Sequence, residues 1–509
     1  MVVKRKKPIE QVGGGPVVGI LAQGKALERW RGVLSRLAPG KGGDIADDPA
    51  EGIVAEVPDE GPATVHLFER PEEAVEVMKT RAMGAFLIDC RSDEAGDDFG
   101  STLAGQVLPQ LLAGTALGRV SARRSILVIL PEEDSTAHHA YAVGTLQLGG
   151  VFVNPSSELD VLGAARRIAR PIEPGKIALC LAGGGIEGMF YELGILRALD
   201  EHLDGRSVTE FDIFSGISAG AVLGAFLANG VTPAEIAHAL HGRESRVDPV
   251  TRGVLFDPNK NEVAKRVLGA LTDFARGKWL TNPVDTAMKV TPTALFSGEK
   301  LRRYLEKQLT RPGLSNDFRN LDKELFVGVT DQDTGTHVTF GTEGLDDMPI
   351  STAVRASAAM TPYYNPEKIG DRYFVDGIFT RTIDIDVAVA AGARLVICVD
   401  PMTPVQVDEP GYVSGRGGFF NTVQSVKSMI RTRLSEAIER VEESYPEVTV
   451  FVFSPTPTDL EKMSGTLMRF FNRTETEEMA FGSARTRIIR DFEWLSSDLS
   501  RYGFNLRRC

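Results

Sequence analysis

The chain has 509 residues and a net charge of -12. Its composition, with 42 % hydrophobic and 25 % charged residues, is ordinary for a globular protein. The acidic balance argues against nucleic-acid binding, because contact with phosphates is driven by clustered Lys and Arg. The four cysteines show no metal-ligand spacing and no disulfide framework, and no apolar run is long enough for a signal peptide or a spanning helix, so we expect a cytoplasmic protein.

Residues 15–170 alternate between strand-like and helix-like segments. Five such units predict a parallel sheet covered by helices. We expect residues 1–14 to form a basic tail, residues 39–62 an inserted loop and residues 171–175 a linker. The strand-like runs are residues 17–22, 64–68, 85–89, 125–130 and 151–154.

This first segment resembles a response-regulator receiver domain, because Asp89 ends the third strand and residues 148–155 lead into the last helix. A working receiver has an acidic pair after strand one, a hydroxyl after strand four and a lysine before the last proline. This chain has Gln23, Pro131 and Asn154 there. The resemblance therefore implies a flavodoxin-like regulatory domain that meets a protein partner without phosphorylation of its aspartate. An unrelated flavodoxin-like module is the alternative.

A glycine-rich loop lies between the strand-like residues 176–182 and the helix-like residues 189–202. Glycines let the backbone approach an anion closely, and the following helix N-terminus adds positive potential. The Gly-x-Gly-x-x-Gly spacing also fits a phosphate site. A serine motif further along the chain favours the oxyanion of a tetrahedral intermediate instead. The candidate oxyanion-binding residues are Gly183, Gly184, Gly185 and Gly188.

The serine motif places Ser218 between Gly216 and Gly220 in a Gly-x-Ser-x-Gly frame. Such glycines permit a cramped strand-to-helix turn, the nucleophile elbow, which exposes the serine hydroxyl at a helix N-terminus. The serine needs a base. The histidines available after it are His238, His241 and His337, and none lies at a recognisable strand end.

A carboxylate acting directly on the serine is the other solution. Asp376 closes the short apolar strand at residues 373–375 and is followed by a glycine turn. The sequence therefore predicts a Ser218–Asp376 dyad.

Residues 176–490 resemble a patatin-like phospholipase domain. The resemblance is carried by Gly183 to Gly188, Gly216 to Gly220, residues 355–362 and Asp376-Gly377, in the order of the family. It implies a three-layer α/β hydrolase fold in which Ser218 is the nucleophile and Asp376 its base, with neither metal nor cofactor. One departure is Glu187, where the family usually carries Arg or Lys.

Two further segments are candidates for lipid contact. Residues 243–292 would form an apolar cap over an acyl pocket, or else a packed helical insertion. Residues 419–441 have apolar side chains at helical spacing with interleaved cations, which fits an interfacial helix or an amphipathic core helix. Residues 491–509 are expected to form a C-terminal helix and tail.

These observations together predict a lipid acyl hydrolase of the phospholipase A or lysophospholipase type. Its substrate would be membrane phospholipid or lysophospholipid, reached by peripheral membrane contact. The alternatives are an esterase or thioesterase acting on soluble acyl groups, and a catalytically silent signalling scaffold.

Overall fold

The computed structural model describes residues 17–38, 52–59, 61–80, 84–91, 99–112, 125–133, 136–146, 148–169, 175–259, 268, 272, 294–407, 410–445, 448–463 and 473–508. The chain divides into two compact units. Unit 1 comprises Met1–Pro174, Glu442–Glu447 and Asp491–Gly503, and unit 2 comprises Gly175–Val441, Val448–Arg490 and Phe504–Cys509.

Unit 1 contains a six-stranded sheet in the order β2-β3-β1-β4-β5-β6. All neighbouring strands run parallel except β2 and β3. Without the edge strand β2, the order is that of the flavodoxin-like fold, which confirms the predicted fold class. The strands are β1 (Val17–Ala22), β2 (Ile53–Val57), β3 (Gly61–Phe68), β4 (Ala85–Asp89), β5 (Ile126–Leu130) and β6 (Gly150–Val153).

Helices cover both faces of this sheet, with α1 and α6 over one apolar cluster and α2, α3 and α5 over another. Helix α19, at the C-terminal end of the chain, packs against α2 and so belongs to unit 1. The helices are α1 (Gly24–Leu37), α2 (Pro71–Thr80), α3 (Leu103–Leu112), α5 (Thr136–Gly144), α6 (Glu158–Ile168) and α19 (Phe492–Ser500).

The prediction of a loop over residues 39–62 is wrong at its end, where β2 pairs with β3 in antiparallel register. The acidic and glycine-rich composition hid a short apolar run, and Ala55 and Val57 of this run are buried. Residues 1–14 and 171–174 lie outside the described residues.

Asp89 ends β4 and is 1 % exposed. The Trp30 indole donates to its Oδ2 at 2.8 Å, and the Arg91 guanidinium donates to Oδ1 at 3.0 Å and to Oδ2 at 2.7 Å. Both carboxylate oxygens are therefore held from inside the domain. We expect these hydrogen bonds to prevent phosphorylation of Asp89.

Unit 2 is built on an eight-stranded sheet in the order β11-β12-β9-β8-β7-β13-β14, with β10 paired to β9. Its central strands are parallel, whereas β10, β11 and β12 form antiparallel pairs. The strands are β7 (Lys176–Leu181), β8 (Ile213–Ile217), β9 (Glu324–Asp331), β10 (His337–Phe340), β11 (Glu367–Ile369), β12 (Arg372–Asp376), β13 (Ala393–Val399) and β14 (Thr449–Phe453).

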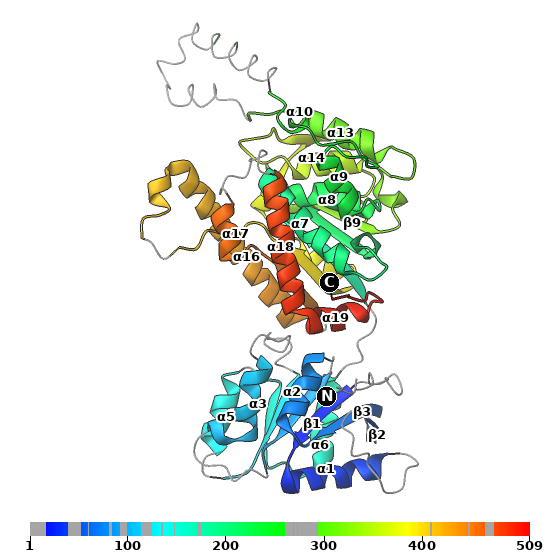
Figure 1. Ribbon diagram of the computed structural model, residues 1–509, viewed down its shortest axis with the longest axis vertical. Helices are drawn as coiled ribbons and strands as arrows, with labels where there is room; N and C mark the ends of the chain where they lie inside the picture. Colours follow the sequence, from blue (N-terminus) through cyan, green and yellow to red (C-terminus); the bar gives the residue numbers. More distant parts are fainter. Residues whose placement is uncertain are drawn as a thin grey trace, which may run out of the picture. The chain divides into compact units, whose positions relative to one another are not determined.

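Helices α7 and α8 lie on one face of this sheet, with α18 packed on α7, while α15 and α16 cover the other face (Figure 1). This is the predicted three-layer α/β arrangement. The helices are α7 (Gly185–His202), α8 (Ala219–Ala228), α9 (Pro233–Leu240), α10 (Arg252–Leu255), α13 (Glu299–Leu309), α14 (Ile350–Ser357), α15 (Ile385–Ala390), α16 (Gly418–Ser444), α17 (Pro457–Lys462) and α18 (Arg473–Arg490).

The two segments predicted to meet lipid have different outcomes. Most of residues 243–292, the segment predicted as an apolar cap or a helical insertion, lies outside the described residues. Helix α16 presents a buried stripe containing Val423, Ile430 and Leu434 to the body of unit 2, as a core helix does. Across the described ranges no single helix is long and apolar enough to cross a membrane. Helices α8 and α9, which are bent by 119° relative to each other, together have the length and composition of a spanning segment.

Candidate active site

Ser218 occupies the turn between strand β8 and helix α8. Its backbone has φ 55° and ψ -115°, a conformation that costs energy for any residue with a side chain. A Cβ at Gly216 would lie 2.5 Å from the Gly220 carbonyl oxygen, and one at Gly220 would lie 2.6 Å from the Ala182 carbonyl oxygen. Both positions therefore need glycine. The geometry is that of a nucleophile elbow.

A second serine holds the elbow in place. The Ser218 N–H donates to Ser357 Oγ at 2.8 Å, and the Ser357 hydroxyl donates to the Gly328 carbonyl at 2.7 Å. Ser357 is fully buried at the end of α14. No role is predicted for Ser357 from the sequence, where its signal is its place in the family-like run at residues 355–362.

Asp376 ends strand β12 and is completely buried. Its Oδ1 accepts the Ile378 N–H at 3.0 Å, and its own N–H donates to the Ala359 carbonyl at 3.1 Å. A Cβ at Gly377 would lie 2.4 Å from the Gly328 carbonyl oxygen, so the glycine allows β9 to approach this turn. Backbone hydrogen bonds thus hold the main chain of Asp376 and one of its two carboxyl oxygens.

Burial raises the pKa of Asp376 to about 7, against the opposing effects of the Ser218 hydroxyl and the Ile378 N–H. Its Oδ2 has no donor with regular hydrogen-bond geometry among the described residues. The serine hydroxyl interacts with this carboxyl group without a well-aligned bond, a looseness common in unliganded sites. A carboxyl group with this pKa exchanges a proton near neutral pH.

The glycine loop lies directly against the serine. A Cβ at Gly183 would be 3.3 Å from Ser218 Cβ and 3.1 Å from Ile378 Cδ1, and Gly185 has a positive φ of 62°. The first intrahelical bond of α7 runs from the Gly188 N–H to the Gly184 carbonyl at 3.0 Å. The first N–H groups of a helix have no acceptor within the helix, so we expect the glycines at the start of α7 to supply N–H groups beside the serine.

Gly188 does not suit the anion-binding role expected for it, because its N–H is used by this helical bond. The absence of a side chain there serves packing instead. A Cβ at Gly188 would lie 3.0 Å from Pro401 Cγ, so the segment after β13 rests on the loop.

Two of the three candidate histidines have other partners, and the third is exposed. His337 Nε2 lies 2.9 Å from Asp384 Oδ2, and its Nδ1 lies 2.9 Å from Thr380 Oγ1. Although burial works in the opposite direction, the hydrogen bond and charge of His337 help to lower the pKa of Asp384 to about 2. His241 contacts Glu477 at 3.0 Å, and His238 is exposed on α9. Asp376 is therefore the titratable group placed to act on the serine.

Glu187, the unusual acid of the glycine loop, is 4 % exposed and interacts with Lys427 of α16, which is 2 % exposed. Burial lowers the pKa of Lys427, and attraction to Glu187 and Asp400 opposes that effect. Arg431 Nη1 lies 3.6 Å from the fully buried Asp400 carboxylate. A buried ionic cluster thus joins α16 to the loop, a feature that sequence analysis missed.

An apolar cluster borders both Ser218 and Asp376. Ile217 precedes the serine and Ile378 follows the aspartate, and the cluster continues into the segment after β13 and into α16. These side chains supply an apolar surface beside the reactive groups. The cluster consists of Ile217, Ile378, Met402, Val423 and Ile430, with Met360 and Val426 packed against it.

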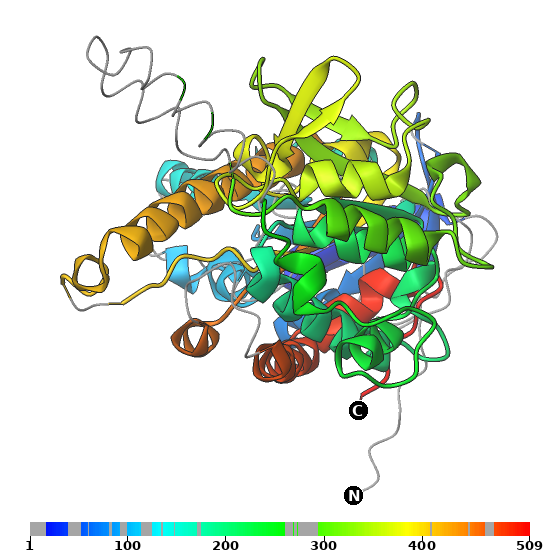
Figure 2. The same ribbon diagram turned by 90° about the horizontal axis from the view of Figure 1, so that it is seen from above.

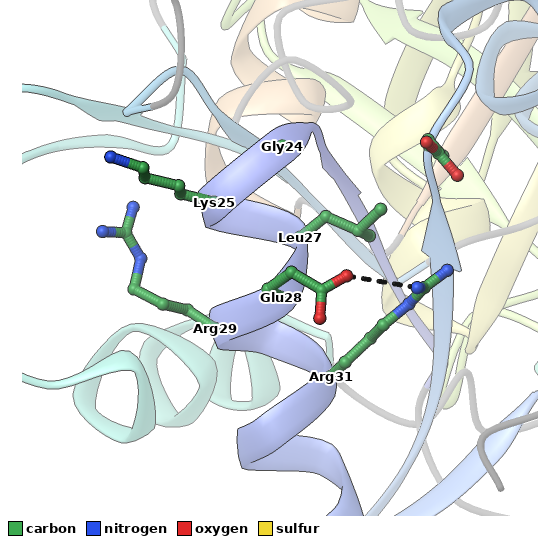
Figure 3. A pocket seen from close by; sticks show the side chains of 7 residues that line it. Gly24, Lys25, Leu27, Glu28, Arg29 and Arg31 are labelled. Atoms are coloured by element: carbon green, nitrogen blue, oxygen red, sulfur yellow. Dashed lines mark hydrogen bonds and ion pairs between the residues drawn. The ribbon is translucent and has the colours of Figure 1, made fainter.

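Unit 1 has a pocket of its own beside the start of α1 (Figure 3). The two arginines of the lining have acidic partners: Arg31 lies 3.3 Å from Glu28, and Arg29 lies 3.7 Å from Glu158. We assign it no role. The lining residues are Gly24, Lys25, Leu27, Glu28, Arg29, Arg31 and Glu69.

Two curated proteins are similar to part of this chain. Patatin-like phospholipase domain-containing protein 7 from Rattus norvegicus is 24 % identical over 258 residues, which are 50 % of this chain and 16 % of that protein. The Mus musculus protein of the same name is 25 % identical over the same length. The match therefore spans only a small part of the length of these relatives.

Among solved structures, VipD from Legionella pneumophila covers 65 % of this chain and 75 % of its own, with 14 % identity and a TM-score of 0.32. The type III effector protein ExoU covers 64 % and 54 %, with 15 % identity and a TM-score of 0.29. The patatin-like phospholipase family model matches residues 179–389, which include Ser218 and Asp376. Residues 179–389 of this chain therefore form a patatin-like phospholipase domain.

Proposed function

We propose that this chain hydrolyses the carboxylic esters of membrane phospholipids or lysophospholipids through the Ser218–Asp376 dyad. The observation that carries the proposal is a serine at a strained strand-to-helix turn beside a fully buried carboxyl group with a pKa of about 7. The family match of residues 179–389 supports it. The apolar cluster beside the dyad supports an acyl chain as the neighbouring group.

In this mechanism the Asp376 carboxylate takes the proton of the Ser218 hydroxyl as Oγ attacks the ester carbonyl carbon. The oxyanion of the tetrahedral intermediate accepts hydrogen bonds from N–H groups of Gly183, Gly184 and Gly185 and is stabilised by the N-terminus of α7. The protonated Asp376 then gives its proton to the leaving alkoxide oxygen, and an acyl-serine remains.

The second half of the reaction repeats these steps with water. Asp376 takes a proton from the water molecule that attacks the acyl-serine carbonyl and returns it to Ser218 Oγ, which releases the fatty acid. A pKa of about 7 suits both directions of proton transfer at neutral pH. Ser357 positions the nucleophile by holding its backbone N–H.

We also propose that the hydrolase comprises residues 176–490 and that residues 15–170 regulate it through a protein partner. Two features support a role for unit 1 in docking a partner rather than in catalysis: its flavodoxin-like sheet, and the Asp89 carboxylate, which is occupied by Trp30 and Arg91.

A fluorophosphonate probe tests the nucleophile directly. We expect it to label the full chain but not the Ser218→Ala variant. The His337→Ala variant, which removes the histidine that could serve as an alternative base, should still be labelled. Initial rates on phospholipid, lysophospholipid and short p-nitrophenyl esters then identify the substrate class. Equal labelling of Ser218→Ala would refute the proposed nucleophile, and turnover of the soluble esters alone would favour an esterase.

A further inference from the structure

Helix α16 carries its charges asymmetrically. Residues 410–435 contain four basic residues and no acidic one, whereas residues 436–444 contain four acidic residues and one basic residue. Two of the basic side chains in the first segment, Arg416 and Arg433, have no carboxylate within ion-pair distance among the described residues. Arg416 stacks instead on Tyr412, with 4.0 Å between the guanidinium carbon and the ring centroid. Asp408 and Glu409 directly precede this segment, and its other two cations, Lys427 and Arg431, are balanced by Glu187 and Asp400. Arg416, just before α16, and Arg433, on the helix, are therefore the cations of the segment that can meet an external anion.

The turn that follows Asp376 adjoins this positive segment. Arg433 Nη1 donates to the Phe379 carbonyl at 2.9 Å, and the Phe379 side chain is 43 % exposed. Met429 lies one helical turn before Arg433 on the same face of α16 and is 53 % exposed. Ile378, the residue before Phe379, points inward to the glycine loop, so the exposed ring lies at the edge of the catalytic site. Figure 2 shows the amino-terminal end of α16 projecting from the rest of unit 2.

We propose that Arg416, Arg433, Phe379 and Met429, here called the α16 patch, dock this protein on an anionic lipid bilayer. The inference rests on the proposed lipid hydrolase function and deepens it. Exposed apolar side chains insert at the boundary between head groups and acyl chains, and nearby cations are attracted to anionic head groups. The overall negative charge of the chain is repelled by the same surface. The patch therefore orients the molecule so that the side next to the dyad meets the lipid.

Vesicle co-sedimentation of the full chain tests this docking. The vesicles are made from ether-linked phosphatidylcholine, alone or mixed with ether-linked phosphatidylglycerol, because ether lipids have no ester to hydrolyse. The test variants are the double Arg416→Gln/Arg433→Gln and the single Met429→Ser. Two matched controls lie elsewhere in unit 2: Arg440→Gln, in the acidic half of α16, and Ile489→Ser, whose side chain on α18 is 51 % exposed.

We expect wild type to bind the anionic vesicles more tightly than the neutral ones, with a difference that high salt removes. Each arginine contributes about fivefold to binding, so the double variant should bind anionic vesicles about 25-fold more weakly than wild type. Met429→Ser should weaken binding to both kinds of vesicle, and the two controls should bind like wild type.

The proposal would be overturned if wild type bound vesicles with and without phosphatidylglycerol equally tightly, or if the double variant bound anionic vesicles as tightly as wild type. Failure of wild type to bind any vesicle would do the same and would favour a protein partner for the patch. The initial rate on a short soluble ester, measured on every variant, reports the proposed hydrolase separately. Loss of docking with an unchanged ester rate therefore leaves the dyad intact, whereas a wild type without ester turnover contradicts the dyad and not the docking.

Discussion

Asp376→Asn should remove activity and at the same time stabilise the protein at alkaline pH. Burial raises the pKa of Asp376 from 3.8 in the unfolded chain to about 7 in the folded protein. The folded state therefore binds a proton that the unfolded state releases between these values, and the free energy of unfolding falls as pH rises through this window. A shift of about three pKa units corresponds to about 4 kcal/mol, of which about 3 kcal/mol falls between pH 5 and pH 8. Asparagine is neutral throughout and avoids this loss.

Urea unfolding of wild type and Asp376→Asn at pH 5 and pH 8 measures this effect. Comparing the two proteins cancels the contributions of other buried acids, such as Asp400 and Glu192, whose pKa values are also raised by burial. The stability of the variant relative to wild type should increase by about 3 kcal/mol from pH 5 to pH 8.

The activity of the same two proteins provides a second measurement. For wild type, kcat/KM on a soluble ester should rise with pH up to about 7 and then level off, because the base acts in its deprotonated form. Asp376→Asn should be nearly inactive at every pH. Identical pH dependence of unfolding in the two proteins, or an active Asp376→Asn beside an inactive His337→Ala, would refute the assignment of the base.

Three further changes test the surroundings of the site and the first unit. Ser357→Ala should lower kcat about tenfold with little change in KM, because the Ser218 N–H loses its acceptor; an equal change in KM would argue for a substrate contact instead. Lys427→Met should cost about 3 kcal/mol in urea unfolding because it removes a buried cation that attracts both Glu187 and Asp400, and the added Glu187→Gln change should restore part of that stability. Asp89→Asn should destabilise unit 1 by about 2 kcal/mol because the charge-assisted hydrogen bonds from Trp30 and Arg91 are lost. The rate on a soluble ester should stay unchanged.

The sequence was most informative where a residue's role depends on its immediate neighbours. Glycines on both sides of Ser218 predict a cramped turn, and an apolar strand that ends in Asp-Gly predicts a carboxyl group at a strand end, so both members of the proposed dyad are visible as local patterns. The spacing of glycines does not indicate whether a backbone N–H already donates to another acceptor. Gly188 matched the pattern of an anion-binding glycine, yet its N–H belongs to the first bond of α7.

Residues whose roles depend on distant contacts were not predictable in this way. Ser357 meets the Ser218 N–H across 139 residues of sequence, and a serine at the end of a helix carries no local signal of that partner. The pairing of β2 with β3 was missed for a similar reason, because five residues in an acidic, glycine-rich stretch gain strand structure only from the edge they join.

The position of Lys427 changes the meaning of Glu187. Considered alone, an acid in the glycine loop removes a cation from beside the oxyanion and suggests an altered head-group preference. In the folded protein the lysine of α16 is buried with that acid, and Arg431 lies near Asp400, so acids and cations are balanced next to the loop. Burial also raises the pKa of Glu192, which favours its neutral form. In the proposed mechanism the oxyanion is therefore stabilised by the loop N–H groups and the N-terminus of α7, and we expect the attraction of anionic head groups to come from cations farther from the serine, such as those of the α16 patch.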